Sequence, residues 1–164
     1  MLSKLKRTKL QKTDKGFTII EVMIVLAIAG LILLIVFLAV PALQRNARNT
    51  SIKSDAGNVS GGISAFESNN NGIVPSTINA ASGVVTLSAS GATTDTIKVG
   101  GSTKVTTAAS NTPPVTNGSL ITPPADSIVV YPGYECSGTV STRATAVVYA
   151  TETSSSTQGQ CIDS

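Results

Sequence analysis

Glu21 is a carboxylate inside an otherwise apolar segment, and its neighbours could supply it with a partner. Residues 22–40 carry no charge and no side-chain hydrogen-bonding group. An ionisable group in a membrane-spanning segment is costly and is rarely found there without a partner. If the chain is cut between Gly16 and Phe17, the new α-amine of Phe17 lies four residues before Glu21, about one helical turn away. The spacing therefore places an amine and a carboxylate on neighbouring faces of the predicted helix.

The position of this cut separates the leader from an ordinary secretory signal. Such a signal is cleaved after its apolar stretch, at a site of small residues. Here the basic leader, residues 1–16, meets the apolar segment at Gly16, and a cut at that point would leave the segment in the mature protein. Glycine has no side chain, so a peptidase can fit closely around the backbone there. A plain membrane anchor, with Glu21 solvated near the membrane surface, is the alternative interpretation.

The residues around the cut resemble a known leader, and the run is Lys15-Gly16-Phe17-Thr18-Ile19-Ile20-Glu21-Val22-Met23-Ile24-Val25. It resembles the class III leader of type IV prepilins and of type II secretion pseudopilins. The resemblance implies that a prepilin peptidase cuts after Gly16 and methylates Phe17. It also implies that Glu21 pairs with the Phe17 amine of an adjacent subunit, as copies of the chain form a helical homopolymer on an assembly platform in the membrane.

The positive charge of the chain is concentrated in the leader. Residues 1–16 hold six basic side chains and one acidic side chain, a net charge of +5, whereas the rest holds six basic and eight acidic, a net charge of −2. The positive-inside rule keeps such a leader in the cytoplasm. We therefore expect a single-pass membrane precursor with its C-terminal part outside, and then an extracellular filament. Nucleic-acid binding is expected to be weak or absent.

The expected fold class is α+β: one long N-terminal helix followed by a small antiparallel β-sheet domain. Residues 17–40 would span about 36 Å as a helix, enough to cross a membrane. Pro41 cannot donate a backbone hydrogen bond, so it is expected to kink or interrupt the helix. Residues 41–70 are predicted to continue it as an amphipathic helix, with an apolar stripe at Ile52, Ala56, Val59, Ile63 and Phe66. The polar residues between them, including Asp55, Ser60 and Glu67, are expected to be solvated or lightly packed.

Residues 71–164 are predicted to form the β-rich globular domain. Short β-branched runs bounded by Gly, Pro, Asn or Ser indicate strands at 84–87, 96–99, 103–107, 127–131 and 145–150. The Gly100-Gly101 pair predicts a hairpin turn between the second and third of these runs. Residues 111–124 contain two Pro-Pro pairs and no periodicity, so they are expected to form a long loop.

Two cysteines, Cys136 and Cys161, lie in the part that is expected to face outside. In an oxidising compartment, such a pair near the end of a small domain indicates one disulfide. Two unpaired thiols are the alternative, and a zinc site would be short of ligands because the chain has no histidine. The resemblance points to the disulfide too, since many type IV pilins end in a disulfide-closed loop, whereas the major pseudopilins usually lack one.

The sequence offers no catalytic constellation, so we expect a structural protein without enzymatic activity, cofactor or metal. Histidine is absent, and no two carboxylates beyond the apolar segment have a spacing that suggests paired acid–base work. Gly100-Gly101-Ser102 lacks the lysine and the helix of a phosphate-binding loop. Asn-x-Ser/Thr triplets begin at Asn49, Asn58 and Asn117, but this pattern is common by chance.

Two further functions stay open beside that of a type IV pilus subunit. A pseudopilin of a type II secretion system has the same kind of leader. A minor pilin that acts as an adhesin or as a DNA-uptake subunit would need exposed aromatic side chains or a basic stripe on its globular domain. The chain offers only Lys98, Lys104 and Arg143 there.

Overall fold

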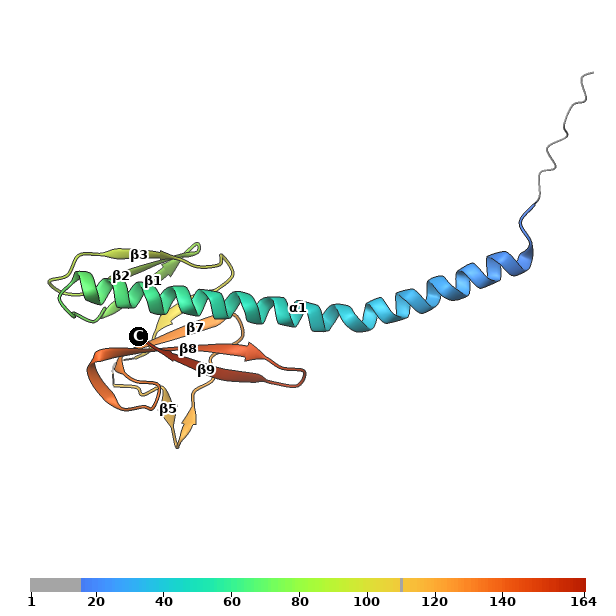
Figure 1. The fold of residues 1–164 in the computed structure, drawn as a ribbon. Helices are drawn as coiled ribbons and strands as arrows, with labels where there is room; N and C mark the ends of the chain where they lie inside the picture. The colour runs from blue at the N-terminus through green and yellow to red at the C-terminus, as the bar shows by residue number, and fades with distance from the viewer. Residues whose placement is uncertain (1–15, 110) are drawn as a thin grey trace, which may run out of the picture. The chain divides into compact units, whose positions relative to one another are not determined.

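The structure is a computed structural model that describes residues 16–109 and 111–164 (Figure 1). The predicted leader, apart from Gly16, lies outside the described residues. The chain divides into two compact units, the first ending at Val40 and the second running from Pro41 to Ser164. Helix α1 (Ile19–Asn69) contributes residues to both.

In the first unit, α1 is apolar on every side. All of residues 16–40 are exposed. A helix that is apolar all round suits a membrane or the packing of other helices around it. By length and composition, α1 is the one helix in the described part of the chain that could cross a membrane. The predicted apolar helix is therefore confirmed, although it begins at Ile19 and not at Phe17.

Helix α1 continues through Pro41, so of the two expected effects of this residue, a kink or an interruption, the interruption is wrong. Proline has no N–H, and the carbonyl of Phe37, four residues earlier, therefore lacks its usual helical partner. Helices in proteins are stabilised mainly by tertiary packing of an apolar face. Beyond Pro41 the apolar stripe of α1, which begins at Ile52, provides packing of this kind.

In its described residues, 41–109 and 111–164, the second unit contains nine strands in three sheets. Sheet A has the order β1-β2-β3, with β1 (Thr77–Ala81), β2 (Val84–Ser88) and β3 (Asp95–Lys98). Sheet B has the order β4-β7-β8-β9, with β4 (Lys104–Thr107), β7 (Ser127–Tyr134), β8 (Val140–Glu152) and β9 (Thr157–Asp163). A separate ribbon pairs β5 (Val115–Thr116) with β6 (Ser119–Leu120). Neighbouring strands are antiparallel except β4 and β7, which are parallel.

The α+β fold class is confirmed, and each of the five predicted runs overlaps a strand. The expected hairpin at Gly100-Gly101 is wrong, because β3 pairs with β2 in sheet A and β4 pairs with β7 in sheet B. The expected long loop at 111–124 is wrong in part, since it contains β5 and β6. Asn117 and Gly118 join these two strands with φ values of 53° and 76°, which suit a two-residue hairpin turn.

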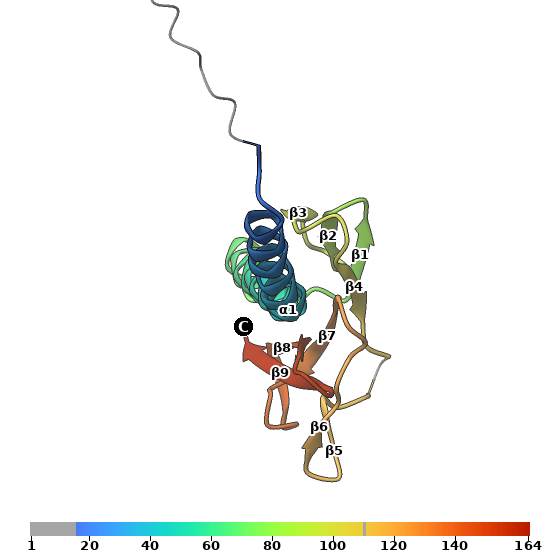
Figure 2. The same cartoon turned by 90° about the vertical axis from the view of Figure 1, so that its right-hand side faces the viewer.

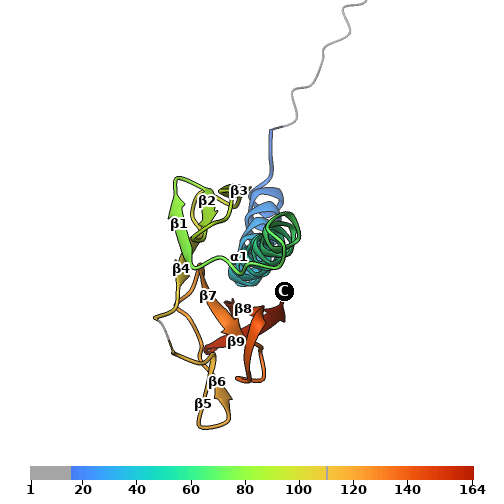
Figure 3. The same cartoon turned by 90° about the vertical axis from the view of Figure 1, so that its left-hand side faces the viewer.

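The apolar stripe of α1 forms the centre of the core, as predicted. Its five members are at most 4 % exposed. Sheets A and B both pack on this stripe, as Figures 2 and 3 show for the second unit. Their largest fully buried side chains in this core are Val85, Leu87, Ile128, Val130 and Val147. A Cβ atom on Gly62 would overlap the side chain of Ile97 in β3. Glycine is unfavourable in the middle of a helix, but at position 62 it lets sheet A approach α1 closely.

The other face of sheet B carries a second, smaller core. Tyr131, Ala146 and Val148 are buried there. Their partly buried neighbours come from the segment between β4 and β7, from the end of β7 and the turn after it, and from β9, and they include Ala108, Leu120, Tyr134, Cys136 and Cys161. Sheet B is thus covered on both faces, and the two cysteines belong to the smaller core.

Asp55 fastens the turn between β3 and β4 to the helix. Its side chain is 7 % exposed and accepts hydrogen bonds from the backbone N–H of Gly100 (3.0 Å) and from Oγ1 of Thr103 (2.5 Å). The expectation that Asp55 and Ser60 are solvated is therefore wrong, since Ser60 is also buried. Buried polar groups require partners, and here the turn supplies them. The chain passes from sheet A to sheet B at this turn. Hydrogen bonds to Asp55 hold the turn, since β3 and β4 do not pair with each other.

Asn70 fastens the turn between β2 and β3 in the same way, at the C-terminal end of α1. Its Oδ1 accepts hydrogen bonds from the N–H (2.8 Å) and Oγ1 (3.0 Å) of Thr93. Its Nδ2 donates to the carbonyl oxygen of Phe66 (2.9 Å). Sheet A is consequently tied to the helix by polar contacts on both sides of β3.

Replacing Asp55 by alanine is expected to lower the free energy of unfolding of the second unit by about 1–3 kcal/mol, because buried donors lose their acceptor. Asp55→Asn should cost less, since its amide oxygen can still accept from Gly100. Urea unfolding of the full chain in detergent, followed by near-ultraviolet circular dichroism, measures this, because all three tyrosines lie in the second unit. Ser54→Ala, at an exposed neighbouring position, is the control. Equal stability of Asp55→Ala and Ser54→Ala would contradict the role of Asp55.

Candidate processing and assembly site

The bond between Gly16 and Phe17 lies in non-helical, exposed chain just before α1. Residues 16–18 precede the first helical residue, Ile19. Phe17 is 88 % exposed, and a Cβ atom on Gly16 would meet no other atom within 4 Å. A peptidase needs an accessible backbone around the bond that it cuts. Residues 16–18 are exposed and non-helical, so the bond is accessible.

Thr18 and Glu21 form a capping box at the start of α1. The carboxylate oxygen Oε2 of Glu21 accepts hydrogen bonds from the backbone N–H (2.9 Å) and from Oγ1 (2.8 Å) of Thr18. In return, the N–H of Glu21 donates to Oγ1 of Thr18 (3.3 Å). Thr18 is thus the N-cap, and Glu21 occupies the third helical position, where such a box places an acid. The box gives the carboxylate two donors from its own chain.

One oxygen of the Glu21 carboxylate stays available. Both bonds from Thr18 go to Oε2, and no described residue donates to Oε1. No basic side chain among residues 16–109 and 111–164 forms an ion pair with Glu21. The nitrogen of Phe17 is part of a peptide bond in the uncut chain, so an amine for Oε1 can arise only after cleavage. The site therefore holds the carboxylate in place while leaving room for one more donor.

Glu21 lies beside an apolar hollow on the helix surface. The hollow has a volume of about 160 Å³ and is lined by Phe17, Glu21, Val22, Val25 and Leu26. Glu21 and Val25 are four residues apart, so they share one face of the helix, and Phe17 lies just before its first turn. An approaching apolar chain would fill this hollow and exclude water from the carboxylate. Exclusion of water strengthens any charge pair that forms there.

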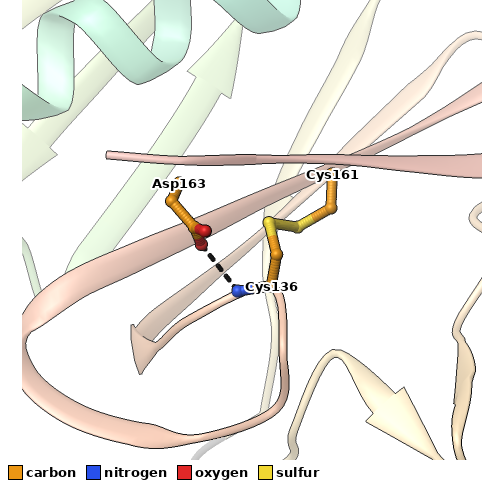
Figure 4. Close-up of side chains that lie close together, drawn as sticks. All are labelled: Cys136, Cys161 and Asp163. Carbon is orange, nitrogen blue, oxygen red and sulfur yellow. Dashed lines mark hydrogen bonds between the residues drawn. A yellow bond between two sulfur atoms is a disulfide. The ribbon is translucent and has the colours of Figure 1, made fainter.

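The structure joins Cys136 and Cys161 in a disulfide with a Cα–Cα distance of 5.8 Å (Figure 4). The bond links the turn after β7 to β9 on the outer face of sheet B. Asp163 adds a second link, because its Oδ1 accepts a hydrogen bond from the N–H of Cys136 (2.6 Å). In the described part of the chain, these three residues are the one group whose types and spacing could hold a metal ion. Since the two sulfurs are bonded to each other, they supply no thiolate ligands.

Two contributors to these sites were missed by the sequence analysis. Thr18 had a readable signal, since Thr-x-x-Glu before an apolar run is the pattern of a capping box. Asp163 had none, because its role depends on the turn after β7 folding back against β9. The structure brings together Thr18 with Glu21, and Cys136 with Cys161. It leaves Gly16 without close neighbours.

The comparisons with known proteins bear on the N-terminal segment alone. The family model for the prokaryotic N-terminal methylation motif matches residues 11–37. This match confirms the prepilin-type resemblance of the segment, and it covers about one sixth of the chain. No curated protein and no solved structure matches the chain. The segment that the motif covers includes the Gly16–Phe17 bond, Thr18 and Glu21.

Replacing Thr18 by alanine is expected to open the first turn of α1, because the N-cap acceptor and the hydroxyl donor to Glu21 both disappear. The backbone amide of Glu21 should then exchange with solvent about tenfold faster, in keeping with the cost of losing an N-cap side chain. Thr18→Ser keeps the hydroxyl and should behave as the unmodified chain. Hydrogen exchange measured by NMR on the full chain in detergent micelles tests this. Unchanged exchange at Glu21 in Thr18→Ala would rule out the capping box.

Proposed function

We propose that this chain, whose residues 11–37 carry a prepilin-type N-terminal methylation motif, is a structural subunit of a type IV pilus filament. The observation that carries the proposal is the motif match, together with an apolar helix that is exposed on all sides. The capping box supports it further, since it holds Glu21 with one oxygen free. A filament of many copies would cover an apolar helix that the single chain leaves bare.

In this proposal the chain is made as a membrane-inserted prepilin. The basic leader, residues 1–16, stays in the cytoplasm, residues 17–40 cross the membrane, residues 41–70 continue the helix and residues 71–164 form the domain outside. A prepilin peptidase cuts after Gly16 and methylates the amine of Phe17. The exposed and non-helical backbone at residues 16–18 supports access of the enzyme to this bond. The methylated amine remains basic and is mostly protonated at neutral pH.

Assembly then uses the charge that cleavage creates. The ammonium group of Phe17 in one subunit pairs with Oε1 of Glu21 in the next, while Oε2 keeps its bonds to Thr18. Buried charges must be paired, so a subunit that enters in the wrong register leaves both groups without a partner. The pair would thus fix the register of a helical homopolymer built on an assembly platform in the membrane. The apolar surface of residues 17–40 supplies most of the contact area.

A pseudopilin of a type II secretion system is the second candidate, because the motif serves both classes. The disulfide between Cys136 and Cys161 favours the pilus, since major pseudopilins usually lack one. A minor pilin that acts as an adhesin or DNA-uptake subunit has less support. Lys98, Lys104 and Arg143 come from three different strands in two sheets. We propose no enzymatic role and no cofactor.

The mature subunit in sheared surface filaments is expected to begin at Phe17 and to carry one N-terminal methyl group. Intact-mass spectrometry of the filament subunit measures both features at once. Gly16→Leu places a bulky side chain at the cut and should leave the precursor uncut in the membrane, whereas Gly30→Ala, on the exposed helix, should be processed normally. A filament subunit that begins at Met1, or beyond Val40, would reject this processing.

Glu21→Gln is expected to insert and to be cut normally but to give few or no filaments. Glutamine keeps an oxygen acceptor for Thr18 but cannot neutralise the ammonium group of a neighbour, which would remain unpaired among apolar side chains. Counting surface filaments by electron microscopy, with immunoblots for the mature chain in the membrane, separates assembly from processing. Thr18→Ser, which keeps the capping box, is the matched control. Abundant filaments from Glu21→Gln would show that the charge of Glu21 does not drive assembly.

A further inference from the structure

The ribbon formed by β5 and β6 projects from the second unit and ends in an Asn-Gly turn (Figures 2 and 3). Asn117 and Gly118 form this turn, with backbone φ values of 53° and 76°. Thr116 pairs with Ser119 directly below it, and all four residues are exposed. The tip of the ribbon is therefore in contact with solvent.

Asn-Gly is a dipeptide in which the backbone readily attacks the side chain before it. The nitrogen of the glycine, after losing its proton to water, bonds to Cγ of the asparagine, and ammonia leaves. The product is a succinimide ring, which a water molecule opens to aspartate or to isoaspartate. Glycine has no Cβ atom to hinder the closing of the ring, and its backbone adopts many conformations. The reaction needs water and a glycine N–H that no other group holds.

At the tip of the ribbon, the N–H of Gly118 is available for this reaction. Among residues 16–109 and 111–164, no group accepts a hydrogen bond from it. A Cβ atom on Gly118 would meet no other atom within 4 Å, so no neighbouring side chain covers the backbone there. Exposed loop tips with small and polar residues are where backbone order is lowest. The glycine nitrogen and Cγ of Asn117 can therefore approach each other.

The chain contains a second Asn-Gly pair, which provides an internal comparison. Asn71 and Gly72 follow the C-terminal end of α1, with similar φ values of 56° and 81°. Here the N–H of Gly72 donates to the carbonyl oxygen of Glu67 (2.7 Å), a bond that closes the end of the helix. Arg143 lies against this glycine, since a Cβ atom on Gly72 would be 2.8 Å from its Nη2. A hydrogen bond thus holds the attacking nitrogen at Gly72.

We propose that Asn117 is a site of spontaneous deamidation and that Asn71 is protected from the same reaction. At Asn117 the nitrogen of Gly118 forms the succinimide, ammonia leaves, and water gives aspartate or isoaspartate. Either product adds one negative charge to the tip of the ribbon. The reaction needs neither a partner nor the proposed filament, because every reacting group except water belongs to the turn itself.

The base of the ribbon should keep its place when the tip changes. The N–H of Ile121 donates to the carbonyl oxygen of Pro114 (2.8 Å), and Pro114 is fully buried. Leu120 packs in the smaller core of sheet B. Isoaspartate carries the main chain through its side chain and so adds a methylene group to the backbone, which disrupts a two-residue turn. Deamidation therefore changes the charge and the shape of the tip while the domain stays folded.

The test follows both asparagines in the full chain, incubated in detergent at neutral pH. Peptide mapping by mass spectrometry measures the conversion of each amide to an acid with time, and enzymatic methylation identifies the isoaspartate. Asn117 is expected to convert at least about fivefold faster than Asn71, the factor that corresponds to one hydrogen bond of typical net strength. In urea with the disulfide reduced, where both sites lose their structure, the two rates should be similar.

Gly118→Ala is the matched variant, and it is compared in urea, where the positive φ of the turn is no longer imposed. Its methyl group hinders the attacking nitrogen, so Asn117 should convert more slowly while Asn71 keeps its rate. Equal rates at the two asparagines in the folded chain overturn the inference, as does an Asn117 that converts in urea alone. A rate difference that persists undiminished in urea assigns it to the local sequence and also overturns the inference.

Discussion

A carboxylate in an apolar environment needs hydrogen-bond donors or a positive charge at every stage, and Glu21 is subject to this constraint throughout. In the uncut chain, two donors of Thr18 serve Oε2. No backbone or side-chain donor in the described part of the chain serves Oε1. The proposed cleavage after Gly16 supplies a donor of the right charge, the amine of Phe17, which in the proposed filament meets Glu21 of a neighbouring subunit. Processing and assembly are then linked, because the cut that releases the leader also creates the partner of the carboxylate.

The second unit is subject to a different constraint, because it has few large apolar side chains with which to form a core. It surrounds one helix stripe with two sheets, so that Phe66, Ile63 and Val59 are covered from both sides. Polar contacts complete the attachment. Asp55 and Asn70 hold the turns on either side of β3, and the Asn49–Glu152 contacts hold the end of β8. The disulfide and Asp163 close the outer face of sheet B, where the apolar core is smallest.

Local patterns in the sequence predicted the positions of the helix and of most strands. The predictions failed where the structure depends on contacts between residues far apart in the sequence. The apolar run was predictable from its length and its lack of charge, and the stripe of α1 from its helical period. Strands such as β7 and β8 were predictable because their β-branched residues favour extended backbone. Strand β9, with the sequence TQGQCID, has little intrinsic strand preference and forms because β8 offers it an edge. The parallel pairing of β4 with β7 joins segments more than twenty residues apart, which no short pattern indicates.

Among the site residues, the Gly16–Phe17 bond and Glu21 were predictable because the motif is contiguous. The most direct test of the account is a cryo-electron microscopy reconstruction of the filament that resolves side chains near Phe17. The account predicts the N-terminal nitrogen of Phe17 in one subunit about 3 Å from Oε1 of Glu21 in a neighbour, with Oε2 still bonded to Thr18. A filament in which Glu21 keeps only Thr18 as its partner, with every Phe17 amine out of reach, would contradict it.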